Sequence, residues 1–452
     1  MKRKDLLMDN SIKSFSRKSW LVLLLFGLIG QIAWSVENMF FNVFVWEDVA
    51  QSLDTVTLMV QLSGIAATLV TLIAGTVSDK VGNRRSFISI GYIIWGITVA
   101  LFGCITPGNI SAVFGTPAAQ SVGIALTLVV VGDCVMTLFG STANDAAYNA
   151  WLTDNTAPAY RGRVESVVSI LPLIAMLIVA GGLGILKDAF GFSALFIGLG
   201  AIITLSGVAG LFIIKDAPKL ERSGGMRDIV YGFRPSVVRE NLPFYATLLA
   251  VLLSGIACQI FMPYLIIFMS TYLGFTTLEY SAVFAVAILG GAAVNIYLGK
   301  LSDRMKKSKL LYIAAGILAF GLFAMYLASM IKAKIALMIF FGIGGFIMIC
   351  GNIFCTSLGG SILRDNTPEG SAGKMQGVRM VASVLIPMLV GPALGNAINK
   401  AQGIPIIEPG ADIMTTEYIP APEIFLVGAA VALLMYAAIP LIVRAEKKIS
   451  KK

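Results

Sequence analysis

Long apolar runs recur along the whole chain, and short polar stretches separate them. A helix of about 20 apolar residues crosses a hydrocarbon core of about 30 Å, and most of these runs are at least that long. The runs are continuous rather than alternating, which favours helices over the strands of a transmembrane barrel. We therefore expect twelve membrane-spanning helices, near residues 20–46, 55–78, 86–105, 120–149, 165–187, 190–214, 243–272, 278–300, 309–331, 335–361, 376–399 and 423–444.

Two polar patterns occur twice, at matching places in the two halves of the chain. A glycine, an aspartate and several basic residues follow one another at 75–85 and, less regularly, at 299–309. The triplet Asp-Asn-Thr follows the fourth apolar run at 154–156 and the tenth at 365–367. A chance origin does not explain two repeats in the same order, so the chain is predicted to be a duplicated bundle.

The duplication predicts how the chain is organised. We expect an all-α polytopic membrane protein in which twelve helices form two pseudo-symmetric six-helix halves. The longest charged connection lies between the sixth and seventh runs and is expected to be a linker. The predicted divisions are an N-terminal bundle at 1–214, a linker at 215–242 and a C-terminal bundle at 243–452.

The distribution of charge gives the orientation. The chain has 34 Lys and Arg and a net charge of +9, but the basic residues gather at the termini and in every second loop. Only Lys187, Lys332, Lys334 and Lys400 fall in the alternate loops. This bias predicts an integral protein of the plasma (inner) membrane with both termini in the cytoplasm, and it argues against a nucleic-acid partner. The five cysteines show no disulfide or metal spacing, and no cofactor is expected.

Polar residues within the first apolar run mark a candidate binding surface. Gln31, Trp34 and Asn38 are spaced so that they share one face of a helix, which would face a cavity or a neighbouring helix. An indole beside amides can stack on a sugar ring and bond its hydroxyls, although bonding between helices is the alternative. Glu37 lies about 100° round the helix from Asn38 and is a candidate for proton coupling.

The fourth run carries a second polar group. Asp145, Tyr148 and Asn149 combine a carboxylate, a phenol and an amide, which suits a solute with several hydroxyls. Asp133 lies about three turns earlier and is either a second functional carboxylate or a packing group. Since a charge inside the membrane costs roughly 2.5–3.5 kcal/mol, each of these acids requires a function. The coupling candidates are therefore Glu37, Asp133 and Asp145.

The repeated basic pattern resembles a known signature. Residues 75–85 are similar to G-x-x-x-D-[RK]-x-G-[RK]-[RK], the loop between the second and third helices of major facilitator transporters, and depart from it at Asn83. The resemblance implies that this loop latches the two halves in one orientation and releases them in the other. Simple anchoring by basic residues is the alternative. The gating residues so implied are Gly75, Asp79, Arg84, Arg85, Asp303 and Arg304.

Residues 144–163 resemble a narrower family, the glycoside–pentoside–hexuronide:cation symporters, which include melibiose permease. The resemblance implies that Asp145 binds sugar and that Arg379 is its basic partner, although an arginine at a membrane end can also be an anchor. That family has two aspartates in its second helix, where this chain has Ala67 and Thr71. Sodium coupling is therefore in doubt, and proton coupling is expected instead.

The function expected is secondary transport of a small polar solute, a sugar or glycoside, by alternating access with a coupled proton. An exporter of amphipathic compounds or lysolipids is the alternative within the class. A membrane enzyme would need a nucleophile with its base, a metal cluster or a phosphate loop, and the sequence shows none of these in its apolar runs. A non-transporting membrane sensor is the alternative of another class. We expect a monomer in the lipid bilayer.

Overall fold

The computed structural model of the protein describes residues 15–156, 160–216, 230–302, 305–368, 375–406 and 417–449. These fall into two compact units. Unit 1 comprises 1–37, 69–179 and 189–225, and unit 2 comprises 38–68, 180–188 and 226–452. Two segments from the first half of the sequence thus pack with the C-terminal helices. The division at 215–242 stays a prediction, and 217–229 lie outside the described residues.

The structure confirms an all-α polytopic membrane protein. Among the described residues, eleven helical segments are long and apolar enough to cross a membrane. One of them, Arg163–Ile213, has 51 residues and covers the two helices predicted at 165–187 and 190–214. Gly191 breaks this segment, because its φ of 80° and ψ of 167° lie outside the helical region. Such a conformation is almost confined to glycine.

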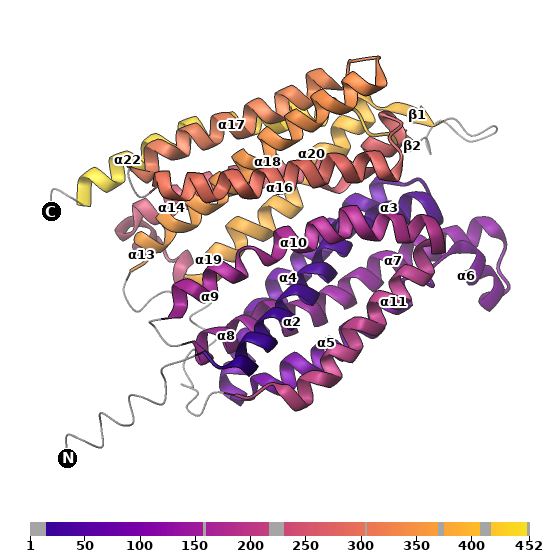
Figure 1. Cartoon of the computed structure of the whole chain (residues 1–452), viewed down its shortest axis with the longest axis horizontal. Helices are drawn as coiled ribbons and strands as arrows, with labels where there is room; N and C mark the ends of the chain where they lie inside the picture. The colour runs from indigo at the N-terminus through magenta and orange to yellow at the C-terminus, as the bar shows by residue number, and fades with distance from the viewer. Residues whose placement is uncertain are drawn as a thin grey trace. The chain divides into compact units, whose positions relative to one another are not determined.

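Unit 1 is a bundle of helices (Figure 1), and large aromatic side chains are buried in its interior. Trp95 and Tyr92 are fully buried, and their rings meet edge to face at 5.4 Å. Helix α5 packs on α7, and α10 packs on α2. The elements that lie wholly or partly in unit 1 are α2 (Arg17–Val36), α4 (Leu53–Val81), α5 (Arg84–Phe102), α6 (Pro107–Phe114), α7 (Ala118–Gly140), a π-helix (Ser141–Tyr148), α8 (Asn149–Asn155), α9 (Arg161–Val168), α10 (Leu171–Leu177), a π-helix (Ile178–Leu183) and α11 (Gly184–Ile213).

Unit 2 holds the remaining elements and begins with the end of the first membrane helix. That end is a π-helix (Glu37–Phe41), α3 (Asn42–Phe44) and a second π-helix (Val45–Val49). The others are 3₁₀ turns at Tyr231–Phe233 and Met262–Tyr264, α13 (Pro235–Glu240), α14 (Leu242–Gln259), α15 (Leu265–Ile267), π-helices at Phe268–Tyr272 and Val381–Leu385, α16 (Thr277–Ser302), α17 (Lys307–Ala328), α18 (Lys334–Asp365), α19 (Gln376–Met380), α20 (Ile386–Gln402), β1 (Ile404–Ile406), β2 (Glu417–Ile419), α21 (Glu423–Leu433) and α22 (Met435–Ile449).

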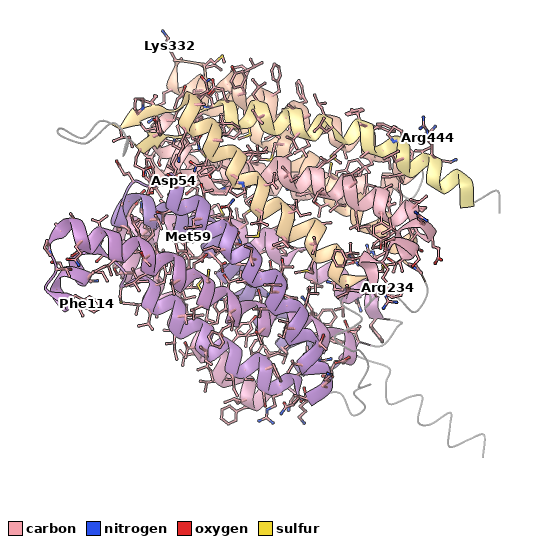
Figure 2. The ribbon with its side chains drawn as sticks, turned by 180° about the vertical axis from the view of Figure 1, so that it is seen from behind. Asp54, Met59, Phe114, Arg234, Lys332 and Arg444 are labelled. Carbon is pink, nitrogen blue, oxygen red and sulfur yellow. The ribbon has the colours of Figure 1, made fainter. Side chains whose placement is uncertain are left out.

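The long helices of unit 2 run side by side, and a two-stranded hairpin lies at the end away from the C-terminus (Figure 1). Strands β1 and β2 pair antiparallel, with Ile404 opposite Ile419. Helix α17 packs on α18 and α21, and α14 packs on α20 and α22. Figure 2 places Asp54 and Lys332 toward the hairpin end of this unit, and Arg234 and Arg444 toward the other end.

The first basic hairpin differs from the prediction in where the helix ends. Helix α4 continues to Val81 rather than stopping near residue 78, and the turn is made by Gly82, whose φ is 68°. Asn83, the departure from the family pattern, caps α5, because its side chain accepts a hydrogen bond from the backbone N–H of Ser86 at 3.0 Å. An asparagine at this position therefore satisfies an otherwise unpaired helical donor.

Pro172 and Pro387 lie where the regular α-helix is interrupted in each half of the sequence. The helix predicted at 165–187 is interrupted at Ser169 and Ile170, and α10 resumes with Pro172 in its first turn. In the other half, the π-helical segment Val381–Leu385 precedes α20, and Pro387 lies in its first turn. Proline has no N–H to donate, and in the first turn of a helix that N–H would have no helical partner, so Pro172 and Pro387 fit where they lie.

Candidate functional site

Two glycines bring the first helix close to the polar part of the fourth helix. A Cβ atom on Gly30 would lie 2.5 Å from Asn144 Oδ1 and 2.6 Å from the Tyr92 hydroxyl. A Cβ atom on Gly27 would lie 2.6 Å from the Tyr148 hydroxyl. No side chain fits at such distances, so α2 can approach the π-helix Ser141–Tyr148 only with glycine at these positions.

Asn144 holds this polar region together inside unit 1. The Tyr92 hydroxyl lies 2.7 Å from the Phe26 carbonyl oxygen and 3.0 Å from Asn144 Oδ1. Asn144 Nδ2 reaches toward Asp145 Oδ1 at 3.5 Å. Asn144 is 2% exposed whereas Asp145 is half-buried, and side chains of Ser141, Asn144 and Trp34 surround the Asp145 carboxylate.

Trp34 lies beside this group. Its ring and that of Trp95 have centroids 5.1 Å apart at an angle of 49°. Gly140 makes the arrangement possible, because a Cβ atom there would lie 2.8 Å from Trp95 and 3.1 Å from Trp34. Trp95 is fully buried while Trp34 is half-buried. Trp34 and Asp145 thus combine an aromatic ring and a carboxylate that are both partly accessible in one unit.

The polar segment of the fourth helix has π-helical geometry. Residues Ser141–Tyr148 connect α7 to α8 and form the i→i+5 backbone hydrogen bonds of a π-helix. Such segments are rare overall, and those that occur are frequently found at functional sites. Ser141 is fully buried, Asp145 is half-buried and Asn149 is exposed. Asp145 and Asn149 therefore lie in different surroundings.

A second group of acids lies further along the same helices. Glu37 is 7% exposed and accepts a hydrogen bond from Thr137 Oγ1 to its Oε1 at 2.9 Å. Asp133, one turn before Thr137, is 1% exposed, and its charge acts on Glu37, as does that of Asp145. Among the described residues, no three side chains of His, Cys, Asp or Glu come together as a metal site.

The other predicted binding residues are spread more widely. Gln31 is half-buried in α2, and Asn38 is exposed. Tyr148 is 3% exposed and donates its hydroxyl to the Leu23 carbonyl at 2.9 Å, which commits it to packing. Asn149 donates to the backbone of Asp145 at 3.0 Å. Arg379 is half-buried in α19 and belongs to unit 2.

The structure describes only some of the predicted gating residues in full. Arg84 is 4% exposed; its Nε lies 3.1 Å from Asp154 Oδ2, and its Nη1 donates to Ser78 Oγ at 2.6 Å. Arg85 is exposed, and its backbone N–H donates to Asp216 at 2.9 Å. A Cβ atom on Gly75 would meet nothing within 4 Å. The side chain of Asp79, and the whole of Asp303 and Arg304, lie outside the described residues.

Sequence reasoning missed several residues that build this region. Thr137 and Tyr92 were not singled out, because a hydroxyl in an apolar run has many possible partners. Gly27 and Gly30 carry the one usable signal, since small residues three apart in a membrane helix are typical of close helix contacts.

The comparisons with known proteins agree with this architecture. The Major Facilitator Superfamily matches residues 23–392. The structure is similar to a nucleoside transporter, NupG, in a mutant form (13% identity, 93% of this chain and 99% of that chain, TM-score 0.67) and in a second structure (15%, 93% and 98%, TM-score 0.64). It is also similar to a bacterial homologue of the human lysosomal transporter Spinster (14%, 95% and 96%, TM-score 0.60). No curated protein matches the chain.

At these identities the similar structures show the fold alone, whereas the family match covers most of the chain. Neither comparison bears out the narrower resemblance to melibiose permease. The chain belongs to the Major Facilitator Superfamily and is an integral membrane transporter of a small-molecule solute.

Proposed function

We propose that the protein moves a sugar or glycoside across the membrane by alternating access, and that a proton moves with it. The observation that carries this proposal is the contact between the half-buried residues Trp34 and Asp145 in one unit. An aromatic face covers the apolar side of a sugar ring, and a carboxylate accepts hydrogen bonds from two of its hydroxyls. A nucleoside is itself an N-glycoside, so the likeness in fold to a nucleoside transporter adds nucleosides to the solutes worth testing.

The coupling proposal rests on the second group of acids. Glu37 and Asp133 are both buried inside unit 1 and carry like charges when ionised. Uptake of one proton removes that repulsion, which a buried site without water cannot screen. Thr137 holds one oxygen of Glu37, and the other carboxylate oxygen of Glu37 is buried without a hydrogen-bond partner. A proton on Glu37 can be gained or lost with little rearrangement.

In this proposal, Asp145 binds the solute, and Glu37 together with Asp133 binds the proton. The membrane orientation, with both termini in the cytoplasm, and the monomeric state belong to the same proposal, and the charge bias supports the orientation.

The test is solute uptake into vesicles that hold the purified protein, with an imposed proton or sodium gradient. The panel contains sugars, glycosides, nucleosides and a lysolipid. We expect a proton gradient to drive uptake of a glycoside, and Asp145→Asn to abolish it while Glu165→Gln, which alters an exposed acid of the same unit, does not. Equal uptake by Asp145→Asn and the parent protein would remove Asp145 from the site, and transport of the lysolipid alone would favour the exporter.

The coupling part has its own readout. Glu37→Gln should lose accumulation driven by a proton gradient and should keep exchange of labelled for unlabelled solute across the membrane. Exchange needs alternating access but no net proton movement, so loss of both activities would contradict a coupling role for Glu37.

A further inference from the structure

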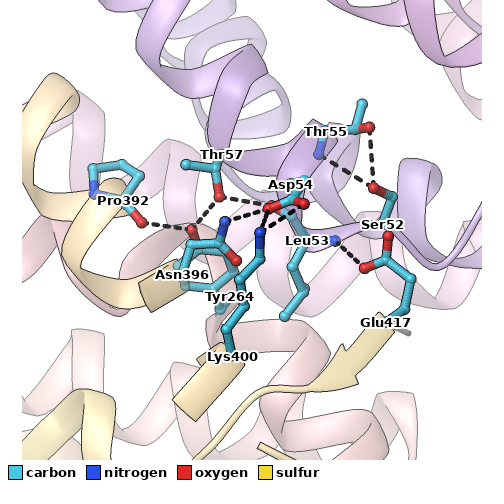
Figure 3. A network of polar contacts seen from close by, with 10 residues as sticks. All are labelled: Ser52, Leu53, Asp54, Thr55, Thr57, Tyr264, Pro392, Asn396, Lys400 and Glu417. Carbon is cyan, nitrogen blue, oxygen red and sulfur yellow. Dashed lines mark hydrogen bonds and ion pairs between the residues drawn. The ribbon is translucent and has the colours of Figure 1, made fainter. Parts of the chain in front are cut away.

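Segments far apart in the sequence meet at the hairpin end of unit 2 (Figure 3). Asp54, in the first turn of α4, accepts a hydrogen bond from Asn396 Nδ2 at 2.6 Å. Lys400 Nζ lies 2.7 Å from Asp54 Oδ1 and 2.8 Å from Oδ2. Asn396 and Lys400 are one turn apart on α20, so a single face of that helix binds the whole carboxylate.

The contact continues inward along α4. Thr57 Oγ1 lies 2.7 Å from the Tyr264 hydroxyl, which donates to the Pro392 carbonyl at 2.9 Å. Tyr264 is fully buried and Thr57 is 6% exposed. One turn further, Gln61 Nε2 donates to the Leu389 carbonyl at 2.8 Å. The same face of α4 therefore bonds to α20 and to Tyr264 at three successive levels.

The β1–β2 hairpin makes a further contact with the start of α4. Glu417 on β2 accepts a hydrogen bond from the backbone N–H of Leu53 at 3.2 Å, one of the donors that the start of α4 leaves unpaired. The chain after β2 is held as well, because Asn399 Oδ1 accepts from the N–H of Ala421 at 2.9 Å. The hairpin is thus tied both to α4 and to α20.

A second set of contacts in unit 2 joins α16 to the segment around residues 180–184. Ser281 on α16 donates to the Ala180 carbonyl at 2.5 Å, and a Cβ atom on Gly184 would lie 2.8 Å from Thr277 Cγ2. Residues 38–68 and 180–188, which precede the interhelical linker, thus pack on helices that follow it.

We propose that Asp54, Lys400 and Glu417 form a lock that holds this end of the protein closed, and that the lock opens once in each transport cycle. The lock rests on the alternating access of the proposed function, because a solute can pass this end only if α4 leaves α20. Asp54 and Lys400 are 55% and 52% exposed at their side chains. An ion pair so exposed to water is weak enough to break and reform.

Glu417 makes the lock sensitive to pH. Burial raises the pKa of Glu417 above the usual range of a glutamate, and the Asp54 charge on α4 adds to this. Bonds from Ser52 and Leu53 and the charge of Lys400 on α20 oppose it, and Tyr272 lies in the π-helix on which β2 packs. The closed form therefore binds the proton more tightly than an open form with a solvated Glu417. Lowering the pH from neutral toward the raised pKa of Glu417 favours closure, and a rise of pH through that pKa weakens it, as long as Asp54 stays ionised and paired with Lys400.

A cysteine in place of Ser63 reports opening. Ser63 lies on α4 beyond Gln61 and is 3% exposed, so a closed protein protects it. The five native cysteines are first replaced by serine, and the full chain is placed in lipid nanodiscs. We measure the rate at which a hydrophilic maleimide labels Ser63→Cys. Asp54→Asn and Lys400→Gln should each raise the rate about 2- to 5-fold, the upper part of the range expected for loss of one partly exposed ion pair.

The control is Asp48→Asn, which removes an exposed carboxylate near the same end and should leave the rate unchanged. Because maleimide reacts with the thiolate, labelling rises with pH at any accessible cysteine, and Glu417→Gln should reduce the rise in the parent protein to this intrinsic part. Labelling at the parent rate in both Asp54→Asn and Lys400→Gln would overturn the lock.

Labelling needs no solute, so the lock and the transport proposal fail separately. Faster labelling in a protein that moves no solute of the panel would support the lock and contradict the glycoside proposal. Glycoside transport with labelling unchanged by either variant would support the glycoside proposal and contradict the lock.

Discussion

Two ion pairs occupy matching positions in the two halves of the sequence, and they differ in burial. Arg84, the first residue of α5, lies 3.1 Å from Asp154, and Lys307, the first residue of α17, lies 2.6 Å from Asp365. Each acid begins an Asp-Asn-Thr repeat. The side chains of the first pair are 5% and 25% exposed, and those of the second are 33% and 59% exposed.

The difference shows what the duplication kept and what it changed. Both halves kept a bond from the third helix of the repeat to the end of the fourth. Only the first pair became part of a buried network, because Arg84 also donates to Ser78 Oγ at 2.6 Å. An exposed pair contributes little, whereas loss of one partner from a buried pair leaves a charge without compensation. The same contact should therefore stabilise the two halves unequally.

The largest effect should come from removing the two bases. Arg84→Gln should lower the free energy of unfolding by about 2–3 kcal/mol, less than for a fully buried pair because Asp154 is partly exposed. Lys307→Gln, the matched variant, should cost less than about 1 kcal/mol. The measurement is thermal unfolding in detergent followed with a dye that reacts with newly exposed thiols, since Cys350 and Cys355 are buried in the folded protein. Equal losses in the two variants would contradict the comparison.

A smaller effect should come from exchanging the bases. Arg84→Lys should cost about 1–2 kcal/mol, because a lysine ammonium does not reproduce the planar fork that reaches Asp154 and Ser78 together. Lys307→Arg should be nearly neutral, since its pair is exposed and makes one bond. Unfolding in the same assay checks both. Tolerance of lysine at 84 would show that charge alone, without the fork, is sufficient there.

The smallest effect should be the response to salt. Raising the salt concentration from about 0.1 M to about 1 M shortens the screening length from about 10 Å to about 3 Å. The cost of Lys307→Gln should vanish at high salt, while the cost of Arg84→Gln should change by only a few tenths of a kcal/mol. The comparison is made by repeating the unfolding series at both concentrations. A cost of Arg84→Gln that falls with salt as steeply as that of Lys307→Gln would mean that water reaches both pairs.

Hydrophobic patterning was sufficient to predict the fold, because a bilayer demands apolar runs of a set length and the basic hairpins recur at matching positions. The ends of the helices were harder to predict. Helix α4 passes through Gly75 and turns at Gly82, since a glycine in a helix followed by favourable residues does not stop it. The π-helix around Asp145 leaves no signal in the spacing, because the sequence does not state which bonds the backbone forms.

The candidate site was predictable as residue types but not as partners. Polar residues in apolar runs pointed to Trp34, Glu37 and Asp145, since each has a cost in a membrane. The lock was missed because Asp54 and Lys400 lie at the ends of helices, where a charge has no cost and needs no explanation. They are 346 residues apart, and only the packing of α4 on α20 identifies the pair.

The break at Gly191 affects how many times the chain can cross the membrane. With its break, the 51-residue apolar stretch Arg163–Ile213 is long enough for two membrane passes, which would return the chain to the side from which it entered. As one unbroken helix the same stretch would pass once, and every later helix would run in the opposite direction, with its basic loops on the wrong side. No atom lies within 4 Å of a Cβ placed there, so a substitution would be opposed by backbone conformation rather than by space. A single backbone dihedral thus bears on the topology of the whole second half.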